Sequence, residues 1–178
     1  MASKSKLQKA AMADVRAGKP RQEVFTAYQA QVSPVKHLAF SIASVADPAR
    51  MKKGATLNNI LFGLLIFAAV TKALMALAMF GTSFVGGLVM LALGLFVPIA
   101  FSIAVRKFDG QIYPFLIVLA AIGALRALMM MTEQGPWMLL DAALLGLIAF
   151  LAFRVQRIVF PNINLFSVRK DAQGDYVW

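Results

Sequence analysis

Four long apolar stretches dominate the pattern of hydrophobic and polar positions along the chain. They cover residues 57–80, 84–105, 111–131 and 136–153, and each is 18 to 24 residues long. A helix needs about 20 residues to cross the roughly 30 Å hydrocarbon core of a bilayer. Inside lipid a helix satisfies its backbone amides within its own segment, and the alternation typical of a membrane β-barrel does not occur here. The pattern therefore predicts an all-α integral membrane protein with four transmembrane helices.

The short polar breaks between these stretches predict how the helices connect. Residues 81–83 and 132–135 contain glycine and polar residues typical of tight turns. Helices one and two, and helices three and four, should therefore form two antiparallel hairpins. Within the second stretch, Pro98 lacks a backbone N–H and should kink the helix.

The segment before the first apolar stretch shows weaker helical patterns. Apolar positions recur at helical spacing after Ser3 and after Pro20, and Ser33 followed by Pro34 is typical of a helix start. Asp47 followed by a proline repeats that start signal before a basic run. We expect short amphipathic helices throughout residues 1–56.

The tail after the last apolar stretch has a different pattern. Residues 165–170 and 175–178 flank a turn at 171–174, which is the pattern of a short β-hairpin. An isolated hairpin is marginally stable in water, so we expect Tyr176 and Trp178 to anchor it on the N-terminal helices or on a partner. The predicted organisation is a helical segment 1–56, a transmembrane domain 57–153 and a tail 154–178.

Lysine and arginine are distributed unevenly around the four stretches. Of the 18 in the chain, ten precede residue 57, two lie at 106–107 and four follow residue 153, whereas the two hairpin turns hold none. Cytoplasmic loops are enriched in these residues, which predicts a multi-pass protein of the inner (cytoplasmic) membrane with both termini in the cytoplasm. We expect its basic face to meet anionic inner-leaflet lipid. That face comprises Lys4, Lys6, Lys9, Arg16, Lys19, Arg21, Arg50, Lys52, Lys53, Arg106, Lys107, Arg154 and Arg157.

Ionisable residues within the apolar stretches are costly and need a reason. Arg126 and Asp141 lie at equal distances from the centre of the second hairpin turn, so they should reach the same depth and could pair across the interface between the two helices. Lys72 should lie near that level, where it could join Asp141 or extend toward the membrane surface. Together with Glu133 these residues form a candidate intramembrane polar cluster. It would serve as a structural clasp between helices, or alternatively it would line an aqueous pathway.

Composition and chemistry limit the function classes. Of 178 residues, 60% are hydrophobic and 15% are charged, whereas soluble domains carry about 25% charged residues. The chain has one histidine and no cysteine, and it lacks the motifs of phosphate loops, serine hydrolases and zinc proteases. We expect neither an enzyme nor a metal or cofactor site.

Three functional hypotheses follow from the sequence. The first is a non-catalytic protein acting through protein–protein contacts, as an accessory or scaffold subunit or as an immunity-type protein. The second is a small oligomeric channel or transporter that uses the polar cluster. The third, and least favoured, is DNA contact by a helix-turn-helix around residues 22–38, where only Lys36 and His37 would face the bases. Partners would then be the bilayer together with copies of the chain or a larger membrane complex, rather than nucleic acid.

Overall fold

The computed structural model describes residues 4–81 and 83–178, and the elements within these ranges are helices. Four helical stretches, Pro48–Ala78, Phe84–Arg106, Ile112–Gln134 and Met138–Val159, are long and apolar enough to cross a membrane, which confirms the predicted multi-pass helical class. The helices are α1 (Lys4–Arg16), α2 (Arg21–Gln29), α3 (Val35–Ala43), α4 (Pro48–Phe80), α5 (Phe84–Leu91), the π-helical η1 (Ala92–Phe96), α6 (Val97–Arg106), α7 (Ile112–Gln134) and α8 (Met138–Val159).

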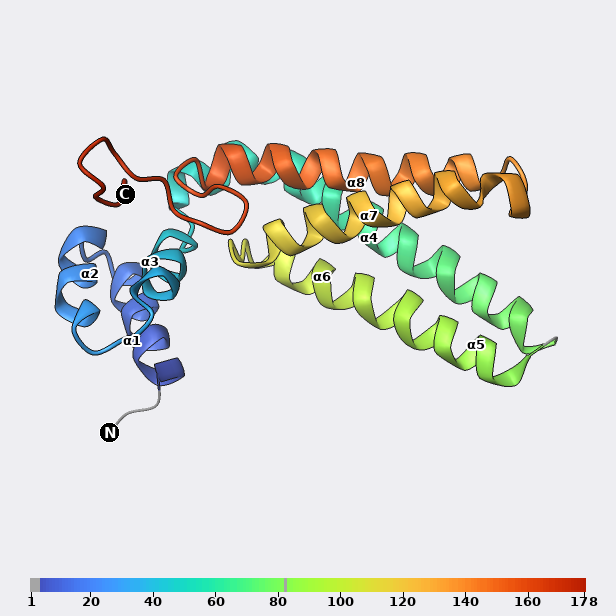
Figure 1. Cartoon of the computed structure of the whole chain (residues 1–178), viewed down its shortest axis with the longest axis horizontal. Coiled ribbons are helices and arrows are strands. Elements are labelled where there is room, and N and C mark those ends of the chain that lie inside the picture. Colours follow the sequence, from blue (N-terminus) through green and yellow to red (C-terminus); the bar gives the residue numbers. More distant parts are fainter. Residues whose placement is uncertain (1–3, 82) are drawn as a thin grey trace.

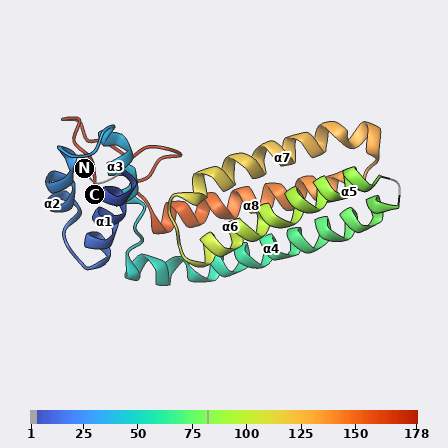
Figure 2. The same cartoon turned by 90° about the horizontal axis from the view of Figure 1, so that it is seen from below.

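The molecule has a head at one end and long helices extending from it (Figure 1). We use "head" for α1–α3 together with tail residues 160–178, and "far end" for the opposite end of the long helices. Figure 2 shows the same division after a quarter turn, with the start of α1 and the tail on the same side. The chain therefore leaves the head along α4, runs back along α5, η1 and α6, and repeats this path along α7 and α8 before the tail rejoins the head.

Helix α4 is longer than the first predicted span, because it begins at Pro48 rather than near residue 57. The Asp47 carboxylate accepts hydrogen bonds from the backbone N–H groups of Ala49 (2.8 Å) and Arg50 (3.3 Å). This caps the first turn, and Pro48 fits there because the first helical residue needs no N–H partner. No proline follows between residues 49 and 80, so the expected short basic helix after Asp47 and the first span form one continuous helix.

Other helix boundaries differ by smaller amounts. Pro34 itself is the cap residue of α3, one position later than the expected Ser33, and its side chain makes no capping hydrogen bond. Helix α8 continues beyond residue 153 to Val159. Helices α4 and α8 therefore both cross the predicted domain boundaries and continue unbroken up to the head.

The long helices form an open arrangement rather than a closed bundle. Within the described residues, α5 and η1 contact α4 but neither α7 nor α8, whereas α8 packs between α4 and α7. Helix α6 meets α7 where the 107–111 loop joins them. In Figure 1 the pair α4–α5 diverges from the pair α7–α8 toward the far end.

The main hydrophobic core follows this geometry. It runs from Val24 and Leu38 in the head to Leu61, Val105 and Ile148 in the long helices. A separate small cluster at the far end contains Ala127, Met138 and Ala142. Side-chain packing is therefore concentrated toward the head.

The head is fastened to the loop between α6 and α7. The Gly110 N–H donates to the Ser44 carbonyl (3.3 Å), and the Gln111 side-chain amide donates to the Ser41 hydroxyl (3.3 Å). A Cβ atom at residue 110 would lie 2.6 Å from the Ser44 oxygen, so this approach requires glycine. The Arg21 guanidinium also donates to the Val45 carbonyl (2.8 Å) and ties α2 to the end of α3.

The tail closes the head from the other side. The Tyr176 and Trp178 rings lie 5.2 and 5.3 Å from the Phe25 ring of α2, and the Trp178 indole N–H donates to the Gln22 side chain. Single antiparallel bridges join Ile163 to Val168 and Lys170 to Tyr176, with the turn at 171–174 between the latter pair. Within the described residues these bridges do not extend into strands.

Candidate functional site

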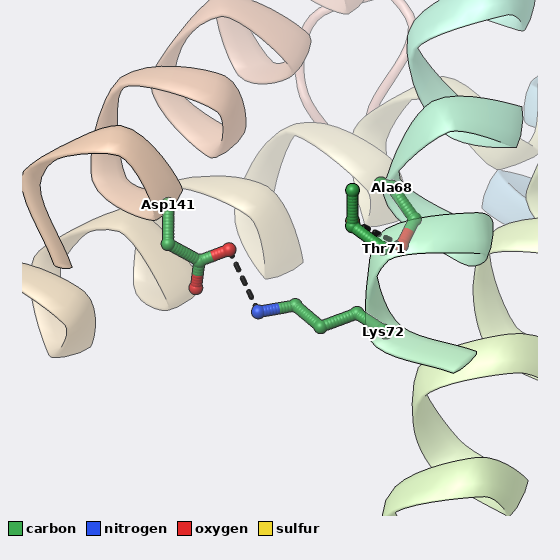
Figure 3. A network of polar contacts seen from close by, with 4 residues as sticks. All are labelled: Ala68, Thr71, Lys72 and Asp141. Carbon is green, nitrogen blue, oxygen red and sulfur yellow. Dashed lines mark hydrogen bonds and ion pairs between the residues drawn. The ribbon is translucent and has the colours of Figure 1, made fainter. Parts of the chain in front are cut away.

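The central polar feature of the long helices is an ion pair between α4 and α8. The Lys72 ammonium lies 2.7 Å from Asp141 Oδ1, and both side chains are about one fifth exposed, at 22% and 17%. Figure 3 shows Lys72 extended from α4 toward Asp141 at the start of α8. Because α4 and α8 belong to the two diverging helix pairs, this contact spans the opening between them. A charge pair shielded from water is held more strongly than one on a soluble surface.

A third element, η1, packs closely against α4 at Lys72. Beside it, the Thr71 hydroxyl donates to the Ala68 carbonyl one turn earlier (3.0 Å), so it is satisfied within α4 (Figure 3). On the neighbouring element, a Cβ atom at Gly94 would lie 2.8 Å from Lys72 Cβ. The stem of Lys72 therefore rests directly on the backbone of η1.

The π-helical segment that contains Gly94 ends just before Pro98. Residues 92–96 are wound more loosely than an α-helix, and Pro98 supplies no N–H to the preceding turn. π-Helical turns are rare and occur often at functional sites. A π segment thus lies directly before Pro98, where the sequence predicts a kink, and its Gly94 contacts the partly buried Lys72.

The other two residues of the predicted cluster lie apart from this pair. Arg126 and Glu133 are exposed, and within the described residues neither forms an ion pair. The expected Arg126–Asp141 contact is wrong, because Asp141 pairs with Lys72, which was the alternative partner. Near the same turn α7 and α8 pack together through Ala127, Met138 and Ala142. Arg126, however, precedes Ala127 by one residue and is rotated about 100° away from that interface.

No family model, curated protein or solved structure matches the chain. The site must therefore be interpreted from its own geometry.

A second polar network, which the sequence interpretation missed, joins three of the long helices nearer the head. Tyr113 of α7 donates from its hydroxyl to Asn58 Oδ1 of α4 (2.6 Å), and the Asn58 amide donates to the Val105 carbonyl of α6 (2.9 Å). Tyr113 and Asn58 are fully buried. A buried and satisfied network of this kind fixes the relative placement of its helices. Asn58 adjoining a second asparagine inside the first apolar stretch was the available signal.

The predicted basic face surrounds the head and the adjoining helix ends. Arg21 and Arg50 are half-buried, the side chain of Lys4 lies outside the described part of the chain, and the remaining members are exposed. Lys19 pairs with Asp14 at 2.9 Å. Hydrogen bonds from Lys19 and from the Tyr28 hydroxyl lower the pKa of Asp14, and burial lowers the pKa of Arg21. Asp14 and Arg21 both remain charged at neutral pH.

Two further features bear on the chemistry of the chain. Within the described residues, no group of three His, Cys, Asp or Glu side chains could hold a metal ion. In α3, the helix expected to contact DNA in the third hypothesis, Leu38, Ala39 and Ile42 are buried in the head and only the first turn is exposed. The helix therefore contributes mainly to the core of the head.

Proposed function

We propose that this chain is a non-catalytic membrane protein that acts through protein–protein contacts, as an accessory or scaffold subunit of a membrane assembly or as an immunity-type protein. The observation that carries the proposal is the construction of the head. It is joined to the α6–α7 loop through Gly110 and Gln111 and closed by Trp178. Protein-binding surfaces gain affinity when they are held rigid before binding.

The membrane helices support the same proposal. Only 11% of the most apolar window of Phe84–Arg106 is buried, against 33% in Met138–Val159. Large apolar faces therefore remain available for lipid or for the helices of other chains. Because packing in lipid depends on close van der Waals contact, an open arrangement fits a protein that completes its packing within an assembly.

We further propose that the head lies in the cytoplasm and that the chain resides in the inner membrane. Sixteen of the 18 lysine and arginine residues lie on the head side of the long helices, and the two far-end turns hold none. This distribution matches the excess of positive charge in cytoplasmic loops.

Site-directed photocrosslinking in native membranes tests the function. A photoreactive residue replaces Ala27, which is exposed on α2, and in a matched variant it replaces Leu140, which is exposed at the far end. We expect Ala27 to give a discrete crosslink to one other polypeptide, identified by mass spectrometry, and Leu140 not to reach that polypeptide. Crosslinks from Leu140 to a second copy, with none from Ala27, would contradict the proposal and favour the channel hypothesis.

The channel or transporter alternative rests on a specific observation of its own. Lys72 and Asp141 place two opposite charges within apolar helices, at the point where the helix pairs diverge. Ionisable groups in such positions often line ion or solute pathways. In that case copies of the chain would have to close the open side of the arrangement.

A further inference from the structure

A groove runs between α4 and α6 at the end of these helices nearest the head. Its volume is about 630 Å³, and its apolar wall is formed by Phe62, Ile66, Ile99 and Ile103. Ser102 completes the floor, and its hydroxyl is satisfied by donating to the Ile99 carbonyl (2.8 Å). The groove therefore offers an apolar channel along the helices with no unsatisfied serine hydroxyl.

The head end of this groove carries two positive charges. Arg106 and Lys107 line it and are exposed. The Arg106 guanidinium lies 5.8 Å from the centre of the Phe62 ring, an arrangement in which the ring face attracts the cation. Within the described residues, neither Arg106 nor Lys107 forms an ion pair with a carboxylate. Two cations thus stand at the mouth of an apolar groove and are available for an external anion.

We propose that this groove binds an anionic phospholipid of the leaflet on the head side. The acyl chain would lie along Ile66, Ile99 and Ile103, and Arg106 and Lys107 would hold the phosphate. Basic pockets between transmembrane helices bind acidic lipid headgroups in this way, and arginine donates to two phosphate oxygens at once. A soluble anion would leave the apolar part of the groove unused. The site is independent of the protein-contact function proposed above.

Native mass spectrometry of the full chain in mild detergent tests the site. After delipidation, the protein is titrated with phosphatidylglycerol and, separately, with phosphatidylcholine of the same acyl chains. We expect phosphatidylglycerol to bind at least tenfold more tightly, because its headgroup carries a net negative charge, whereas the choline ammonium of phosphatidylcholine offsets its phosphate and is repelled by the two cations. Equal affinity for the two lipids, or displacement of phosphatidylglycerol by millimolar inorganic phosphate, would overturn the proposal.

A charge-matched pair of variants separates this site from general surface charge. Arg106→Gln with Lys107→Gln should abolish the preference for phosphatidylglycerol. The control, Lys52→Gln with Lys53→Gln, removes the same charge from exposed positions at the head end of α4 and should keep the preference. Equal loss in both variants would overturn the site and indicate a diffuse electrostatic effect.

A second pair tests the apolar part without changing charge. Ile103→Trp places a large ring in the groove, whereas Ile60→Trp places the same ring at an exposed position of α4 that does not line it. We expect the first variant to weaken phosphatidylglycerol binding at least tenfold and the second to leave it unchanged. This pair also decides the question if the Arg106 and Lys107 variant does not fold. Unaltered binding to the Ile103→Trp protein would contradict the proposed path of the acyl chain.

Discussion

At the scale of single residues, the partner of Asp141 shows what sequence position can and cannot predict. Equal distance from a turn predicts equal depth for Arg126 and Asp141, and near that turn α7 and α8 pack together through Ala127, Met138 and Ala142. The direction in which a side chain points depends on helix rotation, and this rotation directs Arg126 outward. Lys72, whose long stem crosses between α4 and α8, takes the partner position instead.

We predict that breaking this ion pair destabilises the protein and that removing it entirely does not. Asp141→Asn leaves a shielded ammonium without its partner and should lower the free energy of unfolding by about 1–3 kcal/mol. The double variant Lys72→Met with Asp141→Leu should return close to wild type. Unfolding in detergent, followed by circular dichroism, measures both effects.

Arg126→Gln is the control for that series. Arg126 is exposed, so its loss should change the free energy of unfolding by less than about 0.5 kcal/mol. A larger effect of Arg126→Gln than of Asp141→Asn would show that Arg126, rather than Lys72, is the partner. The double variant Lys72→Met with Asp141→Leu also tests the channel alternative. If the chain is a channel, ion flux through this variant in liposomes should differ from that of wild type at equal abundance.

At the scale of elements, the number and class of long helices could be predicted from apolar length alone. Their ends could not be predicted in this way. Helix α4 begins before its apolar stretch, at the Asp47 cap, and α8 continues after its apolar stretch through helix-forming residues to Val159. Glycine positions within the long helices also differ, since η1 meets Lys72 closely at Gly94, whereas Gly146 has open space around it. Small residues permit a close contact, and the rotation of each helix decides which of them is used.

We predict opposite effects for two glycine substitutions in the long helices. Gly94→Ala places a methyl group 2.8 Å from Lys72 Cβ, so α4 and η1 must separate, at a cost of about 1–3 kcal/mol. At Gly63 of α4 nothing lies within 4 Å of the added Cβ. Gly63→Ala should therefore stabilise the protein by up to about 1 kcal/mol through helix propensity.

The same unfolding measurement in detergent distinguishes the two glycine variants. Because both changes add one methyl group to a glycine in an apolar stretch, a general effect of hydrophobicity would move them together. Destabilisation by Gly63→Ala, or tolerance of Gly94→Ala, would contradict the packing of Lys72 on η1.

At the scale of the whole molecule, the division into long helices, flanking helices and a tail was accessible to sequence patterns, whereas their arrangement was not. Nothing in the spacing of apolar residues indicates that the core concentrates toward the head or that the helix pairs diverge at the far end. Both follow from long-range contacts, such as Asn58 with Tyr113 and Gly110 with Ser44. Such contacts depend on which helix faces meet, and amphipathic signals are weak in helices that are apolar all round.

We predict that the tail holds the head in its closed form. Trp178→Ala removes the ring contact with Phe25 and the hydrogen bond to Gln22. Amide hydrogen exchange in α2 should become at least tenfold faster, while exchange in α7 and α8 stays unchanged. The adjacent Val177→Ala is the control, since Val177 is exposed. Unchanged exchange in α2, or acceleration that spreads into α8, would contradict this role.

The contact between Phe25 and Trp178 also dictates an order of events during synthesis. Phe25 leaves the ribosome early, and its ring partners are translated only after all four long helices. Until then α2 can pack on α1 and α3, but the side of the Phe25 ring that Tyr176 and Trp178 cover has no contact from its own chain. The tail can cover Phe25 only after α8 has brought it to the end of the long helices where α1–α3 lie. A chain with one helix inserted in the wrong orientation would leave this side of Phe25 exposed. The contact between Trp178 and Phe25 thus requires that both ends of the chain reach the same end of the long helices.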